Sequence, residues 1–239
     1  MYILITRQLE QSKKFSFLLK KENIENFILP VINIKNVKPK DCDLKNLHNS
    51  NFIIFTSQNS VTSLMANLLP ENLNDKKIAA IGNSTKKILN DMKIHVDICP
   101  ESDYTSESLL QEIKKNSILN KKILIIKGIG GRTYLHEELS KQNTVFNDLN
   151  IYERHLPEDI NKFSYAKLKN ITHVCITSID ILNNFLSIYK ILKLDTIENL
   201  IFIAGNKRIA NECKKNSPNN KVLISLNPSN EEMLKTILK

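Results

Sequence analysis

The sequence predicts an α/β protein built from two lobes, each organised around a parallel β-sheet. Short apolar runs alternate with amphipathic segments along the whole chain, as expected for successive βαβ units. Most of these runs are apolar throughout, which is typical of strands buried on both faces of a sheet. Three strand-end motifs also occur twice in the same order, which indicates an internal repeat.

The predicted elements start with a strand at Ile3–Ile5, followed by a helix whose apolar face is Leu9, Phe15, Leu18 and Leu19. Two more helical faces are formed by Val61, Leu64, Met65, Leu68 and Leu69, and by Leu109, Leu110 and Ile113. The remaining predicted strands are Phe27–Leu29, Phe52–Phe55, Ile78–Ile81, Val96–Ile98, Ile123–Ile126, Val145–Leu149, Val174–Ile176, Leu200–Ala204 and Val222–Ile224.

The repeat relates strand ends in the two halves of the chain. The Thr56-Ser57 pair returns as Thr177-Ser178, a shift of 121 residues, and Gly82-Asn83 returns as Gly205-Asn206, a shift of 123 residues. The strand that ends in Ile5-Thr6-Arg7 has a looser counterpart ending in Ile126-Lys127. Each half therefore carries the same series of three strand ends.

The repeats need not coincide with the lobes. Leu29-Pro30-Val31-Ile32-Asn33-Ile34 and Leu149-Asn150-Ile151-Tyr152-Glu153-Arg154 occupy matching places and read as extended segments that could pair as a two-stranded tie. The predicted boundaries are residues 1–31 plus 157–239 for lobe one and 40–148 for lobe two. Residues 32–39 and 149–156 form the linking ladder.

Composition excludes several classes of protein. The net charge of +9 suits either a polyanionic ligand or a general lysine bias, and the absence of Trp, of arginine-rich helices and of basic-aromatic interleaving argues against nucleic acid. A basic cleft for an acidic small molecule stays open. No signal peptide or membrane-spanning run is predicted, and four cysteines without a CxxC pair suit a reducing, cytoplasmic location.

Hydroxyl residues follow two of the repeated strands, at Thr56-Ser57 and Thr177-Ser178. Such residues cap helices, and this structural role is expected for at least one member of each pair. Together with free backbone N–H groups at a helix start they could also hold a carboxylate. A serine nucleophile is not expected, because neither pair lies in a GxSxG turn.

Glycines mark the other strand ends, and all five lie between an apolar run and an amphipathic one. Gly82-Asn83-Ser84-Thr85 and Gly205-Asn206-Lys207-Arg208 permit close approach of a ligand to the backbone. Lys127-Gly128-Ile129-Gly130-Gly131-Arg132 resembles an anion-binding loop but is neither GxGxxG nor a Walker A sequence. Arg132 could bind a carboxylate, or it could be a solvated residue. The five histidines have no metal-ligand spacing, so they are expected at the surface or at a strand edge, and no metal site is predicted.

The ordered set of motifs resembles the uroporphyrinogen-III synthase family over essentially the whole chain. The matching segments are Thr6-Arg7, Leu29-Pro30-Val31, Phe55-Thr56-Ser57, Ile81 to Thr85, Lys127-Gly128 with Arg132 and Leu135, Ile151 to Arg154, Thr177-Ser178 and Ala204-Gly205. The resemblance implies two flavodoxin-like lobes joined by a two-stranded ladder. The substrate it implies is hydroxymethylbilane, an open tetrapyrrole with many carboxylates, which the enzyme dehydrates and closes with inversion of the last ring, without metal or cofactor.

The resemblance also assigns candidate site residues. Tyr152 matches the family's tyrosine thought to assist departure of the hydroxyl, although it could equally pack the ladder. The expected substrate-binding residues are Arg7, Thr56, Ser57, Gly82, Ser84, Thr85, Lys127, Gly128, Arg132, Thr177, Ser178, Gly205, Lys207 and Arg208. Lys207-Arg208 departs from the family, which often has Thr there. The site is expected in a cleft between the lobes of a monomer, with hydroxymethylbilane synthase as a partner enzyme.

Two other functions remain open at this point. A two-lobed binding or sensor protein for small anions would share the same strand ends and helix starts. A nucleotide-dependent reductase is the weaker alternative, because the glycine loop lacks a dinucleotide fingerprint.

Overall fold

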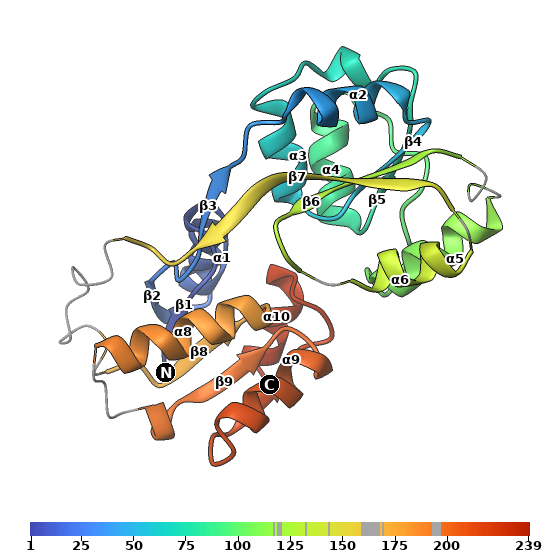
Figure 1. The fold of residues 1–239 in the computed structure, drawn as a ribbon. Helices are drawn as coiled ribbons and strands as arrows, with labels where there is room; N and C mark the ends of the chain where they lie inside the picture. The colour runs from blue at the N-terminus through green and yellow to red at the C-terminus, as the bar shows by residue number, and fades with distance from the viewer. Residues whose placement is uncertain are drawn as a thin grey trace. The chain divides into compact units, whose positions relative to one another are not determined.

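A computed structural model describes residues 1–116, 118, 121–131, 133–142, 144–158, 168, 170–192 and 197–239. The chain divides into two compact units, unit 1 comprising Met1–Asn33 with His155–Lys239 and unit 2 comprising Ile34–Arg154. Each unit contains one five-stranded sheet (Figure 1). The prediction of two α/β lobes with parallel sheets is confirmed.

Unit 1 is built on the sheet β2-β1-β8-β9-β10, in which every observed pairing is parallel. Its strands are β1 (Tyr2–Ile5), β2 (Glu25–Ile28), β8 (His173–Ile176), β9 (Ile201–Ala204) and β10 (Val222–Ile224). In chain order these strands are arranged 2-1-3-4-5, the order found in flavodoxin. The sheet is therefore doubly wound, with its topological switch point between β1 and β8.

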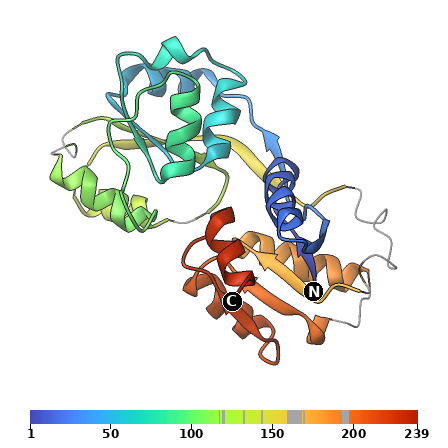
Figure 2. The same ribbon diagram turned by 180° about the vertical axis from the view of Figure 1, so that it is seen from behind.

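Helices cover both faces of the unit 1 sheet. One apolar core contains Leu182 and Phe185 of α8 (Ile179–Ile191) and Ile209 of α9 (Lys207–Asn216). The other contains Phe15 of α1 (Leu9–Lys21) and Met233 of α10 (Asn230–Ile237). Seen from behind, α10 in red lies near α1 in blue, as their packing requires (Figure 2). A short 3-10 turn, η4 (Ile197–Asn199), precedes β9.

Unit 2 is built on the sheet β3-β7-β6-β4-β5. Its strands are β3 (Asn33–Asn36), β4 (Phe52–Phe55), β5 (Lys77–Ala80), β6 (Ile123–Gly128) and β7 (Phe146–His155). One face is covered by α2 (Asp41–Asn49), α3 (Gln58–Met65) and α4 (Asn83–Asp91), the other by α5 (Ser106–Lys115) and α6 (Tyr134–Lys141). A 3-10 turn, η1 (Pro70–Leu73), precedes β5.

The sheet registers follow the repeat. Ile5 pairs with Ile28 in unit 1, and Ile126 pairs with Leu149 in unit 2, so both partners shift by the same 121 residues. β6 and β4 therefore flank the unit 2 position that corresponds to the switch point of unit 1. The predicted strand at Val96–Ile98 is shorter than expected, because only Ile98 forms a bridge, to Ala79.

The two segments expected to tie the lobes together lie next to each other in the unit 2 sheet. β3 neighbours β7, Val37 N donates to Ile151 O at 2.8 Å, and Lys35 lies 3.7 Å from Glu153. β7 is one continuous strand of 10 residues, visible in yellow in Figure 1. Its length lets one strand serve both as part of the sheet and as the exit from the unit.

Candidate functional site

The candidate site is a cavity of about 140 Å³ in unit 2, at the carboxyl ends of β4, β6 and β7. Ligands of doubly wound sheets bind outside the strand ends at the switch point, which is the place occupied by this cavity. The residues that line it are Thr56, Ile81, Ser106, Ile125, Lys127, Gly128, Gly130, Gly131, Leu135, His136, Tyr152 and Arg154. Four of the predicted site residues, Thr56, Lys127, Gly128 and Tyr152, are therefore brought together here.

A β-bulge aims Tyr152 at this cavity. Lys127 pairs with Asn150, but the next pair is Gly128 with Tyr152, so β7 gains one residue relative to β6. Such a bulge re-aims the side chains that follow it. Tyr152 is 1% exposed, and its backbone oxygen accepts a 2.8 Å hydrogen bond from Ile129 N.

Two side chains hold the Tyr152 hydroxyl. Arg154 Nη2 donates to it at 2.8 Å, with the guanidinium carbon 5.0 Å from the ring centroid, and Ser57 Oγ lies 3.0 Å away. Ser57 Oγ already accepts from Ser60 N at 3.1 Å as the N-cap of α3, so its own proton can point to Tyr152. In that arrangement both Tyr152 lone pairs are occupied, and its O–H is free to donate to a ligand.

Gly128 provides the space that Tyr152 occupies. A Cβ atom on residue 128 would lie 2.5 Å from Tyr152 Cε2 and 2.6 Å from Cζ. Ordinary van der Waals contacts between carbons are about 3.5–4.0 Å. Glycine is therefore required by the close approach of the ring.

The hydroxyls at the end of β4 have mainly structural partners. Thr56 Oγ1 donates to Ile126 O at 3.1 Å, which ties the end of β4 to β6. Ser57 both caps α3 and contacts Tyr152. The capping role predicted for one member of this pair thus belongs to Ser57, which also supports the tyrosine.

Charged residues gather beside the tyrosine, and sequence inspection found only one of them. Lys127 Nζ lies 3.7 Å from Asp148 Oδ2, and the Asp148 oxygens lie 2.7 and 2.8 Å from His136 Nε2. His136 lines the cavity from helix α6 with its side chain 22% exposed, whereas the histidines were expected at the surface or at a strand edge. The alternation of side chains along a strand could have shown that Asp148 lies on the same face of β7 as Asn150. It could not have shown that helix α6, which carries His136, packs against that face.

The start of α4 carries the next group of predicted residues. An ideal Cβ on Gly82 would lie 2.9 Å from Tyr104 Cβ, so this glycine also accommodates a packed tyrosine. Ser84 is exposed and its backbone oxygen accepts from Gln58 Nε2 at 3.2 Å, whereas Thr85 is buried. Ile81, directly before Gly82, is the residue of this turn that lines the cavity.

Unit 1 uses the equivalent strand ends differently. The repeat shift places Arg7 where unit 2 has Gly128, and the buried Arg7 guanidinium donates to Pro228 O and, at 2.8 Å, to Asn230 Oδ1. Burial lowers the pKa of Arg7 to about 10, so it remains a cation at neutral pH. The hydrogen bonds of Arg7 give it a structural role inside unit 1.

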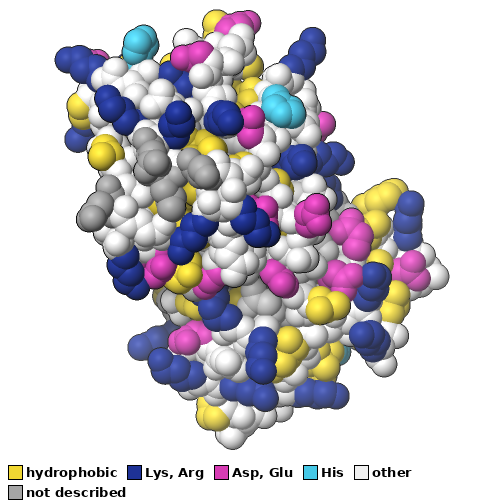
Figure 3. Space-filling view, turned by 90° about the vertical axis from the view of Figure 1, so that its right-hand side faces the viewer, with side chains coloured by type: hydrophobic (Ala, Val, Ile, Leu, Met, Phe, Trp, Pro, Cys, Tyr) yellow, Lys and Arg dark blue, Asp and Glu magenta, His cyan; other side chains and the backbone are white. Residues whose placement is uncertain are grey.

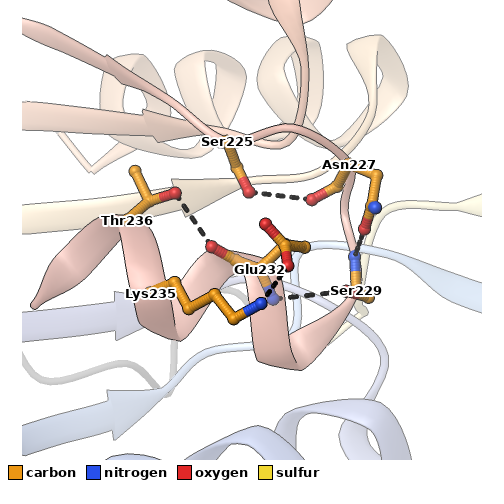
Figure 4. Close-up of polar contacts among 6 residues, drawn as sticks. All are labelled: Ser225, Asn227, Ser229, Glu232, Lys235 and Thr236. Atoms are coloured by element: carbon orange, nitrogen blue, oxygen red, sulfur yellow. Dashed lines mark hydrogen bonds and ion pairs between the residues drawn. The ribbon is translucent and has the colours of Figure 1, made fainter.

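The loop that receives Arg7 is held by its own polar contacts (Figure 4). Ser225 Oγ donates to Asn227 O at 2.9 Å, Ser229 N donates to Asn227 Oδ1 at 2.9 Å, and Ser229 caps α10 through Glu232 N. Pro228 lies over Gly205, where an ideal Cβ would be 2.8 Å from Pro228 Cβ. Gly205 is therefore needed for the loop to close over the end of β9.

The other predicted residues of unit 1 lie at helix starts. Ser178 caps α8 by accepting from Ile181 N at 3.1 Å, directly after Thr177. Lys207 and Arg208 are exposed in the first turn of α9. Arg132, the remaining predicted residue, lies outside the described residues.

The described residues contain neither a cluster suited to a metal ion nor a membrane-spanning helix. No described group of three or more His, Cys, Asp and Glu side chains is placed to hold a metal ion. No described helix is long and apolar enough to cross a membrane.

On the face in Figure 3, Lys and Arg side chains are spread out and interspersed with Asp and Glu, as the scattered lysines of the sequence predict.

Comparison with known proteins identifies the family. The family model described as uroporphyrinogen-III synthase HemD matches residues 13–235. The chain belongs to the uroporphyrinogen-III synthase family. The resemblance inferred from the motifs is thereby confirmed.

Individual members of the uroporphyrinogen-III synthase family agree with this assignment. A Methanocaldococcus jannaschii protein provisionally named uroporphyrinogen-III synthase is 39% identical over 176 residues, covering 72% of this chain and 69% of that protein. The uroporphyrinogen-III synthase of Proteus mirabilis is 26% identical over 195 residues, covering 78% of this chain and 98% of that protein.

Solved structures of the family share the fold. The Helicobacter pylori uroporphyrinogen-III synthetase has a TM-score of 0.65 at 18% identity, covering 99% of this chain and 98% of that one. A mutant Thermus thermophilus uroporphyrinogen III synthase has a TM-score of 0.63 at 15% identity, covering 100% and 98%. The two-lobed fold therefore persists at low sequence identity.

Proposed function

We propose that this chain catalyses the dehydrative cyclisation of hydroxymethylbilane, with inversion of ring D, to give uroporphyrinogen III. The observation that carries the proposal is the Tyr152 hydroxyl, held by Arg154 and Ser57 at the wall of a cavity at the strand ends of unit 2. Family membership supplies the reaction, and this arrangement supplies a group suited to its first step.

The substrate brings most of the chemical reactivity. The nitrogen lone pair of the terminal pyrrole that bears the hydroxymethyl group, at the other end of the open chain from ring D, expels the hydroxyl, which leaves as water once it gains a proton. The resulting carbocation is attacked by the substituted carbon of ring D, through a spiro intermediate, before the macrocycle closes. The protein must therefore fold the open chain and stabilise charge, which are matters of positioning and electrostatics.

Tyr152 assists departure of the hydroxyl in this proposal. Its O–H donates a hydrogen bond to the leaving oxygen while Arg154 and Ser57 donate to the phenol oxygen. A hydrogen bond in which one partner is charged is stronger than a neutral one, and linked hydrogen bonds polarise one another. The donation from Arg154 therefore strengthens the bond that Tyr152 offers as negative charge develops.

Cations and backbone N–H groups bind the carboxylates of the substrate. Lys127 and Arg154 line the cavity, and Gly128 exposes backbone beside them. Thr56, Gly82, Ser84 and Thr85 in unit 2, with Arg132, and Thr177, Ser178, Gly205, Lys207 and Arg208 in unit 1, are the further candidates for these contacts. Helix starts suit this role because they attract anions.

The remaining features of the proposal concern the enzyme's setting. We propose a cofactor-independent hydro-lyase that works as a cytoplasmic monomer. Because the substrate closes spontaneously without inversion, supply by a nearby hydroxymethylbilane synthase would favour the correct product. Activity that persists in a chelator and in dialysed protein is the expected result for cofactor independence.

The test is to generate hydroxymethylbilane in situ, add the protein, oxidise the products and separate the porphyrin isomers. The type III isomer should appear in proportion to the protein added, above a type I background in its absence. Formation of type I alone would refute the proposal.

A further inference from the structure

We infer that Asp148 and His136 are positioning residues, which hold the Lys127 ammonium in the cavity in the orientation that binds a substrate carboxylate. This inference rests on the proposed function. Asp148 is an acidic residue beside Lys127 and His136, at a site proposed to bind a polyanion. Its carboxylate repels the carboxylates of that ligand, so a compensating role for Asp148 is expected.

The contacts of Asp148 identify its partners. Both of its oxygens lie within 2.8 Å of His136 Nε2, and Oδ2 lies 3.7 Å from Lys127 Nζ. The three side chains come from different elements, β7, β6 and α6, and are 29%, 14% and 22% exposed for Asp148, Lys127 and His136. Asp148 on β7 therefore contacts one side chain of helix α6, His136, and one side chain of strand β6, Lys127, and both of these side chains are partly buried.

The geometry argues against a role for His136 as a base. Nε2 is engaged by Asp148, and Nδ1 is buried with no hydrogen-bond partner among the described residues. Neither nitrogen therefore offers an accessible lone pair to a ligand. The His136 ring also packs edge-on against Phe146, with centroids 5.5 Å apart, which fixes its place.

The same geometry leaves Lys127 able to bind a ligand. At 3.7 Å the ion pair with Asp148 is longer than a hydrogen bond, so the N–H donors of the ammonium remain available. A lysine side chain has large rotamer freedom, which it loses when it binds a ligand. Attraction to Asp148 restricts that freedom before the substrate arrives, and the bidentate contact with His136 holds Asp148 still.

Asp148→Asn separates positioning from simple charge. It removes the carboxylate charge but keeps an oxygen for His136. If Asp148 positions Lys127, KM should rise roughly three- to tenfold with kcat within about twofold of wild type. If Asp148 acted only by repulsion, its neutralisation would instead lower KM, and that result would overturn the inference.

A double-mutant cycle with Lys127→Gln tests whether Asp148 acts through the lysine. Asp148→Asn should change KM by less than about twofold in the Lys127→Gln background. An equal effect in both backgrounds would contradict a role through Lys127. Glu138→Gln, which removes the carboxylate of an ion pair with Lys141 on the same helix as His136, is the matched control and should leave KM unchanged.

Two further measurements keep the test decisive. If Asp148→Asn lowers the melting temperature too far for assay, His136→Gln should raise KM in the same direction. Nuclear magnetic resonance of labelled histidine, assigned with His136→Asn, should show a proton on Nε2, which is the nitrogen that contacts Asp148. An Nε2 without a proton would overturn the assigned geometry whatever the activity, whereas wild-type protein that forms no type III isomer would refute the proposed function itself.

Discussion

Gly128→Ala tests the link between the backbone of β6 and the position of Tyr152. The added Cβ would lie 2.5 Å from Tyr152 Cε2 and 2.6 Å from Cζ, about 1 Å closer than carbon atoms normally approach. The backbone φ of Gly128 is not positive, unlike those of Gly130 and Gly131, so alanine at position 128 adds this overlap without backbone strain. The ring must therefore move by about the same 1 Å.

That displacement is large relative to the contacts that hold the hydroxyl. The Tyr152 oxygen lies 2.8 Å from Arg154 and 3.0 Å from Ser57, and a shift of about 1 Å takes it beyond hydrogen-bonding range of at least one. Misplacement of a reacting group by about 1 Å can cost about 100-fold in rate. Overpacking of a core costs about 1–3 kcal/mol in stability, so the protein should remain folded if its stability is ordinary.

The assay is the rate of type III isomer formation, with thermal melting measured in parallel. We expect Gly128→Ala to lower kcat about 100-fold while the melting transition stays cooperative. In a Tyr152→Phe background the same change should cost little more, because the hydroxyl is already absent. Wild-type kcat in Gly128→Ala would refute the claim that this close approach positions the catalytic group.

Three more predictions address other parts of the molecule. Tyr152→Phe should lower kcat about 100-fold and change KM much less, because in the proposed reaction the hydroxyl acts on the departing group. Unchanged kcat in steady-state assays would remove Tyr152 from the mechanism. Arg7→Lys should lower the free energy of unfolding in urea by about 1–3 kcal/mol, because lysine has no planar group that can donate to both Pro228 O and Asn230 Oδ1. An unchanged urea midpoint would contradict the structural role of Arg7 in unit 1. A thiol reagent should modify exposed Cys42 quickly. Burial raises the thiol pKa values of Cys175 and Cys213 to about 12, so these two should react only after unfolding. Rapid modification of either one in the native protein would contradict its burial in the core.

Much of the fold was predictable because buried parallel strands have a simple signature. The apolar runs at Phe52–Phe55 and Val174–Ile176 are buried on both faces, so each appears in the sequence without alternation. The 121-residue shift anticipated that Ile5 and Ile126 occupy equivalent positions, and the registers agree. Local sequence and long-range pairing point to the same answer here.

The functional site was less predictable, because the two equivalent strand ends differ in their surroundings. One is packed against side chains of its own unit, and the other opens onto a cavity. Arg7 and Lys127 both looked suited to binding an anion, yet Arg7 is bonded within unit 1 and Lys127 lines a cavity. The difference arises from Pro228 and Asn230, more than 200 residues from Arg7 in the sequence. A motif alone does not reveal such a distant partner.

The same limit explains the residues that sequence inspection missed. Asp148 and His136 are 12 residues apart and belong to a strand and a helix with no shared motif, so only tertiary packing brings them together. Arg154 was visible in the segment that contains Tyr152, but its contact with the hydroxyl depends on the extended conformation of β7, where residues two apart face the same side. Recognition of the strand would have been enough to find this contact.

A structure of the protein with bound uroporphyrinogen III tests the central claim most directly. The account predicts that the bridging carbon which carried the substrate hydroxyl contacts the Tyr152 hydroxyl, with a product carboxylate on Lys127. Product bound with this carbon away from the strand ends of β4, β6 and β7, and with Tyr152 touching none of it, would contradict the account.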